Sequence, residues 1–292
     1  MPRKTPQFRS WDDYYIPGTA VLRNKLTSVT EPYGTTDPDK LRQFEERAAS
    51  VRLIAAKLDP IRGSFDYNHL KAIHRALFQD VYDWAGEERT GPLSQMSKSG
   101  PDVVHYPPGD PRAPMVNYGY YPAPAIADAA NLQFRRLAKQ DLLRGRDREE
   151  FVAGLAEHWG EINTIHSFRE GNTRTQFVFF SELARHAGYE LDITQFAENR
   201  PLREEFVHAR FYNQSTTRTD RLEAALDKAL TETRTAGSTE SAEAGEQGAL
   251  MRTVRLAFPA PPTTTRGQDS STPEPNSAAK TSPNRGRGFE RD

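Results

Sequence analysis

The chain has 292 residues, and its 39 Lys and Arg against 40 Asp and Glu leave a formal net charge of −1. This balance lacks the basic excess typical of nucleic-acid-binding proteins, so we expect no direct nucleic-acid partner. The absence of cysteine excludes disulfide scaffolds, thiolate zinc sites and cysteine nucleophiles. No segment approaches the roughly 20 apolar residues that cross a bilayer, and the N-terminus lacks a secretory signal, which together predict a cytoplasmic protein with no membrane partner.

Most of the first 235 residues show helical periodicity. Thr36-Asp37-Pro38 predicts a helix start, because it combines an N-cap residue with proline at the first helical position. Apolar residues then recur at steps of three and four as far as Leu58. Four more helices are predicted: after Asp66, over 151–162, over 177–183 with Gly188 as the C-terminal cap, and from Pro201 towards Leu230.

Two regions are not helical by pattern. Residues 87–124 are rich in Gly, Pro and Tyr and predict a flap or hairpin followed by a long loop. From about Pro259 the chain is dominated by Pro, Ser, Thr and Gly, which predicts disorder because such a segment buries too little apolar surface. Three arginines give its end a basic character, which leaves secretion as an effector open, although ordinary solvated disorder is the simpler explanation.

The residues with the strongest chemical signal lie between the third and fourth predicted helices, in His166-Ser-Phe-Arg-Glu-Gly-Asn-Thr-Arg-Thr-Gln. The unpaired N–H groups of a helix that starts near position 173 favour phosphate. Gly171 allows positive φ, and Asn172 adds an amide donor. Glu170 is an oxygen ligand suited to Mg²⁺, and Arg174 can bind phosphate. His166 is the side-chain type that acts as a general base near pH 7.

Each of these residues also has an ordinary structural explanation. A single histidine after an apolar helix is commonly structural, Gly-Asn is common turn chemistry, and Glu170 with Arg174 could form a helix-surface ion pair. It is their combination at one helix start that favours transfer of a phosphoryl-centred group to a hydroxyl. A zinc hydrolase is disfavoured, because His158 and His166 are eight residues apart and no HExxH motif is present.

The segment HSFREGNTR resembles the signature of Fic proteins, His-Pro-Phe-x-(Asp/Glu)-Gly-Asn-Gly-Arg-x-x-Arg. Residues 69–90 resemble the segment of that family that leads into its substrate flap, and residues 15–26 resemble its N-terminal region. Three separated blocks in the family's order extend the resemblance over roughly residues 13–235.

This resemblance implies an all-α Fic-fold helical bundle with a small β-hairpin flap, followed by the disordered tail. It implies four parts: an N-terminal helical extension (1–63), a catalytic domain (64–205), a C-terminal helical part (206–235), and a linker with the polar tail (236–292). It also implies transfer of AMP from ATP to a Ser, Thr or Tyr hydroxyl of a target protein.

The family's residue roles carry over onto the matching positions. His166 would be the base, Glu170 would hold Mg²⁺ between the α- and β-phosphates, and Phe168 would anchor the loop in the core. The remaining residues with implied roles are Gly171, Asn172 and Thr173, whose backbone would bind phosphate together with Arg174, and Arg89, Thr90 and Lys98 in a target-aligning flap over 89–100.

Two departures from the signature matter for its chemistry. Thr173 replaces its second glycine, for which we expect a modest effect. Phe177 replaces its final arginine, which in the family binds the terminal phosphates and pairs with an inhibitory glutamate. Arg169 or another arginine could substitute, but the orientation of ATP and the mode of control are left open.

The chain most resembles toxin-type Fic proteins, which a separate small antitoxin controls, since its one match to the inhibitory motif (residues 194–199) lies in the body of the fold. The resemblance suggests a type II topoisomerase subunit as a target. Two alternatives remain at this stage: a phosphotransferase like Doc, which also lacks the final arginine, and a Fic-fold binding protein without catalysis.

Overall fold

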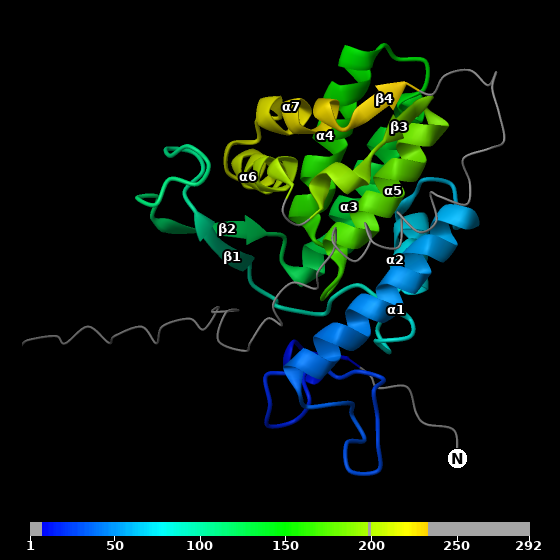
Figure 1. Cartoon of the computed structure of the whole chain (residues 1–292), viewed down its shortest axis with the longest axis vertical. Coiled ribbons are helices and arrows are strands. Elements are labelled where there is room, and N and C mark those ends of the chain that lie inside the picture. The colour runs from blue at the N-terminus through cyan, green and yellow to red at the C-terminus, as the bar shows by residue number, and fades with distance from the viewer. Residues whose placement is uncertain (1–7, 198–199, 233–292) are drawn as a thin grey trace, which may run out of the picture.

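The computed structural model describes residues 8–197 and 200–232, which form a helical bundle with two small sheets (Figure 1). The predicted linker and polar tail (236–292) lie outside these residues. The helices are α1 (Pro38–Leu58), α2 (Tyr67–Phe78), α3 (Ile126–Lys139), α4 (Arg148–Ile165), α5 (Asn172–His186), α6 (Pro201–Thr216) and α7 (Asp220–Lys228). The strands are β1 (Met96–Pro101) paired antiparallel with β2 (Met115–Tyr120), and β3 (Tyr189–Leu191) paired antiparallel with β4 (Leu230–Glu232).

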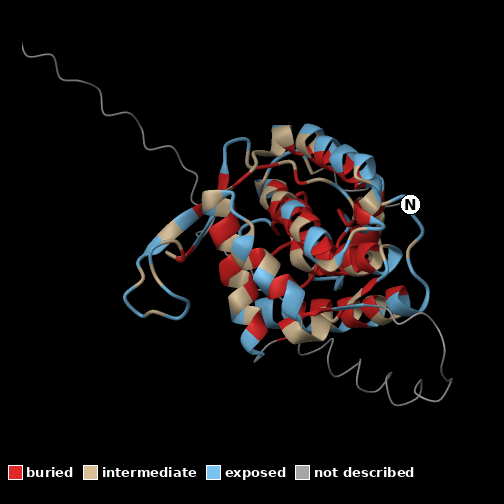
Figure 2. Ribbon diagram, turned by 90° about the horizontal axis from the view of Figure 1, so that it is seen from above, coloured by how far each residue is buried: buried red, intermediate tan, exposed pale blue. Residues whose placement is uncertain are grey.

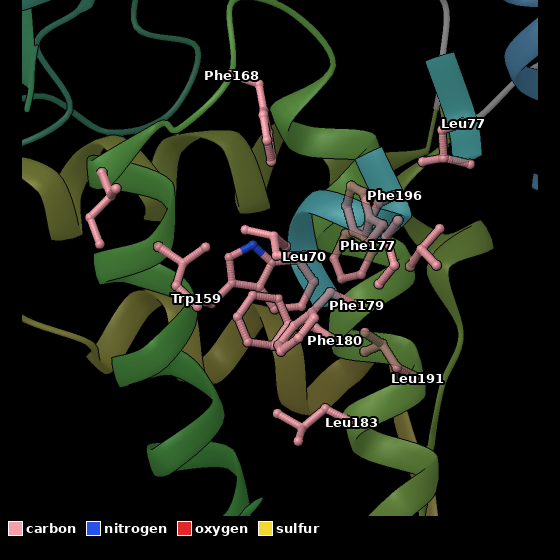
Figure 3. Packing of buried hydrophobic residues seen from close by; sticks show 14 of the residues in the cluster. Leu70, Leu77, Trp159, Phe168, Phe177, Phe179, Phe180, Leu183, Leu191 and Phe196 are labelled. Atoms are coloured by element: carbon pink, nitrogen blue, oxygen red, sulfur yellow. The ribbon is translucent and has the colours of Figure 1, made fainter. Parts of the chain in front are cut away.

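The centre of the bundle is α5. Residues 174–180 of this helix are all buried, which is the pattern of a helix surrounded by other elements. Helices α2 and α4 contact it directly. Figure 3 shows its phenylalanines gathered with Trp159 of α4, whose ring stacks on Phe180 with centroids 4.3 Å apart. Figure 2 shows the same arrangement by burial: the helices turn their buried faces inward.

The predicted helix boundaries are confirmed where a capping signal was present. The Asp37 carboxylate accepts hydrogen bonds from the backbone N–H groups of Asp39 and Lys40 at the start of α1. Asp66 caps α2 in the same manner. Gly188, with φ 94°, follows the end of α5 as expected of a C-terminal glycine.

Three features were not predicted. Helix α3 lies in a segment to which no helix was assigned, and the β3–β4 pair was missed because each strand has only three residues. The last predicted helix is two helices, because Thr217 leaves α6 in the left-handed region (φ 62°). The expected division between a catalytic domain (64–205) and a C-terminal part (206–235) falls inside α6, so the chain has no break there.

The hairpin of β1 and β2 projects from the bundle next to α6 (Figure 1), and its connecting loop is mostly exposed (Figure 2). Tyr118 on β2 stacks on Phe211 of α6 with ring centroids 4.3 Å apart. The Gln214 side chain on α6 donates a hydrogen bond of 2.5 Å to the Gly119 carbonyl. The hairpin is therefore fixed to the bundle through α6.

Candidate active site

The segment between α4 and α5 turns sharply at both ends. Helix α4 ends at Ile165, and His166 follows with φ 50° and ψ 60°, a region that few non-glycine residues adopt. Gly171, with φ 79°, precedes α5. A Cβ atom at this position would lie 2.4 Å from a ring carbon of Phe78. The predictions of a positive φ at Gly171 and of a helix start near residue 173 are confirmed.

Asn172 holds the loop closed. Its Nδ2 donates to the Phe168 carbonyl (2.7 Å), and its Oδ1 accepts from the Phe168 N–H (2.9 Å). Both polar atoms of the side-chain amide therefore bond within the loop, and the expectation that Asn172 also offers a donor to a ligand stays a prediction. Phe168 is buried and stacks on His74 with centroids 3.9 Å apart, in agreement with its predicted place in the core.

His74 of α2 supports the loop, and no motif in the sequence predicts this role. Its Nδ1 accepts from the Gly86 N–H (2.8 Å), so its Nε2 donates to the Glu170 carbonyl (2.9 Å). Burial lowers the pKa of His74 to about 3. The ring is therefore neutral near pH 7, and it ties α2 to the backbone of residue 170.

His166 lies at the entrance of the loop and is only 5% exposed. Its ring packs against Tyr120, and its Nε2 lies 3.4 Å from the Lys98 ammonium. A lysine ammonium has no acceptor, so a hydrogen bond between the two makes Nε2 the acceptor. Burial, with the charges of Lys98 and Arg89, holds the pKa of His166 well below its usual value. A neutral imidazole with an unprotonated Nε2 is the form that can accept a proton.

Arg89 lies next to the backbone of His166 and not on the hairpin. The assignment of Arg89 as a flap residue is therefore corrected. Arg89 is 2% exposed, and each nitrogen of its guanidinium donates to a backbone carbonyl. Nε donates to His166 (2.7 Å), Nη1 to Gly91 (3.0 Å) and Nη2 to Tyr121 (2.5 Å). Arg89 thus fixes the backbone of His166 to the segments on either side of the hairpin.

Of the predicted flap residues only Lys98 lies in the hairpin, where it pairs in register with Tyr118. Thr90 precedes the hairpin, and its N–H donates to the Tyr14 hydroxyl (3.1 Å). The predicted flap over 89–100 therefore began too early, because a Gly91-Pro92 peptide and an irregular segment precede β1.

The start of α5 combines an uncapped helix end with one carboxylate. The first N–H groups of a helix lack intrahelical acceptors, and at α5 no side chain caps them. Glu170 is half-buried beside them, and its Oε1 accepts from the Gly171 N–H (3.0 Å). The described residues contain no cluster of three or more His, Cys, Asp or Glu side chains placed to bind a metal. A single carboxylate fits Mg²⁺ that takes its other ligands from phosphates and water.

His158 is a structural residue, in agreement with the argument against a zinc hydrolase. Its ring nitrogens lie 2.9 Å from Gln133 Nε2 and 3.3 Å from Gln140 Oε1. Burial lowers its pKa to about 4.

Arg174 is largely committed to an ion pair inside the bundle. Its Nη2 contacts Glu45 of α1, whose other oxygen accepts from the Tyr82 hydroxyl. The side chains of Arg174 and Glu45 are 4% and 5% exposed. Nη1 of Arg174 has no hydrogen-bond partner among the described residues, and the residue lines the cavity described below. Nη1 is therefore available to a ligand, and the phosphate contact of Arg174 stays a prediction.

Arg169 faces away from the cavity, which contradicts its predicted role as a phosphate ligand. Its Nη2 donates to the Tyr15 hydroxyl (2.7 Å), and its guanidinium lies over the ring of Trp11, 4.1 Å from the centroid. It fastens the N-terminal segment to the loop.

A cavity of about 170 Å³ opens beside His166 and the start of α5. Phe177 forms part of its wall and packs against Phe206 and Phe196, with ring centroids 5.4 Å and 5.2 Å apart. The sequence analysis missed the part of the lining that comes from α6 and the segment before it. These residues are Phe196, Arg203, Phe206, Val207 and Arg210. The spacing of Arg203, Phe206 and Arg210 on one helix face is the signal that could have found them.

Comparison with known proteins identifies the family. Residues 64–184 match the model of the Fic/DOC family. This chain is 37% identical to "Probable protein adenylyltransferase y4lH" of Sinorhizobium fredii over 190 residues. That alignment covers 65% of this chain and 83% of the other protein. This chain is 35% identical over 181 residues, 62% of its length, to protein adenylyltransferase VbhT of Bartonella schoenbuchensis, of which it covers 32%.

Solved structures agree on the fold. The N-terminal Fic domain of a VirB-translocated Bep effector from Bartonella quintana, solved with bound ADP, superposes with a TM-score of 0.60 at 22% identity. That alignment covers 76% of this chain and 96% of the other. BepC of Bartonella tribocorum, solved with bound AMPPNP, gives a TM-score of 0.59 at 20% identity and covers 76% and 98% of the two chains.

No helix in the described ranges is long and apolar enough to span a membrane. The arrangement of a buried histidine, a glycine turn and an uncapped helix start, together with the 37% identity over most of a relative's length, places this chain in the Fic/DOC family.

Proposed function

We propose that this chain is a protein adenylyltransferase that transfers AMP from ATP to a Ser, Thr or Tyr hydroxyl of a target protein. The observation that carries the proposal is the neutral His166 imidazole, which lines the cavity beside the uncapped start of α5 together with Lys98, the neighbour of its Nε2. The names of the relatives and the nucleotides bound in the two similar structures support it.

In this mechanism His166 Nε2 accepts the proton of the target hydroxyl as that oxygen bonds to the α-phosphorus of ATP. The bond between the α-phosphorus and the bridging oxygen breaks, and pyrophosphate leaves. The N–H groups at the start of α5 bind the phosphate oxygens, since a helix N-terminus favours negative charge. Arg89 keeps His166 in place through its carbonyl.

Glu170 would hold Mg²⁺, which neutralises phosphate charge when bound. The β1–β2 hairpin would align the target segment by strand pairing, since Lys98 of β1 lies next to His166. Lys98 would contribute a positive charge at the same place.

The test is to incubate the protein with ATP labelled at the α-phosphate or the γ-phosphate, in a lysate and with Mg²⁺. Wild-type protein should transfer the α-label, and intact mass should show the addition of AMP. His166→Ala should reduce transfer by at least about 100-fold, the usual size of a general-base effect, while it still binds nucleotide. Transfer of the γ-label alone would refute the adenylyltransferase assignment.

Phe177 favours a second candidate, a Doc-like phosphotransferase, because the position of the signature's final arginine holds an aromatic ring. The two labels separate these candidates. Nucleotide binding without transfer of either label would instead support a binding protein without catalysis.

The proposed partners follow from the same assignment. A cytoplasmic type II topoisomerase subunit is the first target to test for AMP addition. A small antitoxin encoded beside this chain is the proposed regulator. Co-expression of such a protein should suppress both growth arrest and labelling, and unchanged labelling would count against it.

A further inference from the structure

Thr173 and Phe177, the two departures from the Fic signature that matter for its chemistry, both contact α6. Phe177 packs against Phe206 of α6, with ring centroids 5.4 Å apart. Arg203 lies one turn before Phe206 and Arg210 one turn after it, so all three share a helix face, and all three line the cavity. The Phe177 ring therefore packs against α6, and α6 brings two arginines, Arg203 and Arg210, to the cavity.

Arg210 reaches the start of α5. Its Nη1 donates to the Thr173 hydroxyl at 3.3 Å, a contact that a glycine at position 173 could not make. Its guanidinium also lies 5.4 Å from the Phe206 ring centroid. Thr173 and Phe206 thus hold the cation beside the N–H groups that begin α5.

The charge of Arg210 has no carboxylate partner in the described part of the chain. Its Nε is buried without a hydrogen-bond acceptor. Burial lowers the pKa of Arg210. Tyr120 raises this pKa, and the positive charge of Arg203 lowers it further. A partly buried cation without a counter-charge is unfavourable on its own, and it is stabilised when an anion binds.

We propose that Arg210, positioned by the Thr173 hydroxyl, binds the polyphosphate chain of the nucleotide and takes over the cationic contact that Phe177 cannot make. Arg203 adds a second positive charge on the same face. The inference rests on the proposed nucleotide-dependent function, but it concerns binding and does not depend on which phosphorus is attacked.

The test compares equilibrium binding of ATP, ADP and adenosine, with Mg²⁺, to full-length variants. Arg210→Gln should weaken binding of ATP and ADP about tenfold, as expected for loss of a charge-assisted contact, and leave adenosine binding unchanged. Arg218→Gln is the matched control, because Arg218 is an exposed arginine paired with Asp220 and does not line the cavity.

Thr173 provides a second, independent variant. Thr173→Val keeps the side-chain shape without the acceptor and should weaken ATP binding in the same direction, by about threefold. Thr173→Ser should restore it. Unchanged thermal unfolding midpoints would separate this positioning role from a structural one.

Two results would overturn the inference: wild-type affinity of Arg210→Gln for ATP, or an equal loss for ATP and adenosine, which would assign Arg210 to the base. These outcomes are separate from failure of the proposed function. If wild-type protein transferred only the γ-label while Arg210→Gln lost ATP affinity, the phosphate contact would stand and the adenylyltransferase assignment would not.

Discussion

At the scale of single residues, the loop between α4 and α5 is held in place by side chains that bond to its backbone. Arg89 fixes the His166 carbonyl, His74 holds that of Glu170, and Asn172 closes the loop on Phe168. Each contact joins residues at least four positions apart, and two of them join separate elements. Positions that look catalytic in the sequence, such as Arg169 and Arg174, are instead partly or wholly used to hold the bundle together.

A substitution at Glu45 tests whether Arg174 stabilises the bundle through its buried ion pair. Glu45→Gln leaves the buried Arg174 charge without its counter-charge and weakens the bond from Tyr82. We expect a loss of about 3 kcal/mol in the free energy of unfolding, the usual size of breaking a buried ion pair. Urea unfolding measures it.

The exposed pair of Arg42 and Asp39 on the same helix is the control. Asp39→Asn should change stability by less than about 1 kcal/mol. Equal losses in the free energy of unfolding for the two variants would contradict a larger contribution from the buried pair.

At the scale of elements, the hairpin and α6 act as one unit. Tyr118 stacks on Phe211, its hydroxyl donates to the Pro101 carbonyl (2.5 Å) and accepts from the Val103 N–H (3.2 Å). Arg221 of α7 donates to the Val103 carbonyl (2.7 Å). Because α6 also carries Arg210, the proposed nucleotide side and the proposed target side of the site share one support.

Tyr118→Ala should therefore loosen the hairpin without unfolding the bundle. We expect faster amide hydrogen exchange in peptides from residues 96–120, by about ten-fold for a loss of about 1–2 kcal/mol of aromatic packing and hydrogen bonding. Peptides from α5 should exchange as in the wild-type protein. Tyr118→Phe keeps the stacked ring and should show a smaller change, and equal exchange in hairpin and α5 would disprove local loosening.

At the scale of the whole molecule, buried neutral histidines make stability depend on pH. Burial lowers the pKa of His74 to about 3 and of His158 to about 4, and it lowers that of His166 as well. Below about pH 6.5 the unfolded chain binds protons at these histidines and the folded chain does not. Glu182 acts in the opposite direction, because burial raises its pKa to about 7 and the folded chain keeps a proton that the unfolded chain releases.

The histidines outnumber Glu182, so the free energy of unfolding should fall as the pH drops from about 7 to about 5. The expected slope is on the order of 1.4 kcal/mol per pH unit for each proton not balanced by Glu182. Urea unfolding at several pH values measures it, and His158→Gln should flatten the dependence. Stability that rose towards pH 5 would show that the carboxylate dominates.

The sequence by itself determined the helices with clear caps, the loop between α4 and α5, and the family. These signals are local: Asp37 and Pro38 start a helix, Gly188 ends one, and Gly171 adopts the positive φ that glycine favours. The Fic signature is likewise a run of neighbouring residues, so the roles proposed for His166 and Glu170 could be predicted from it.

Only the tertiary structure decided which cations face the cavity. Arg89 and Arg169 were expected at the site from their positions in the sequence, but burial and hydrogen bonding turned both into supports. Arg203 and Arg210 carry no motif and reach the cavity because α6 packs against Phe177. The physical reason is that the direction of a long side chain depends on the acceptors and rings that surround it, and in this protein those come from distant segments.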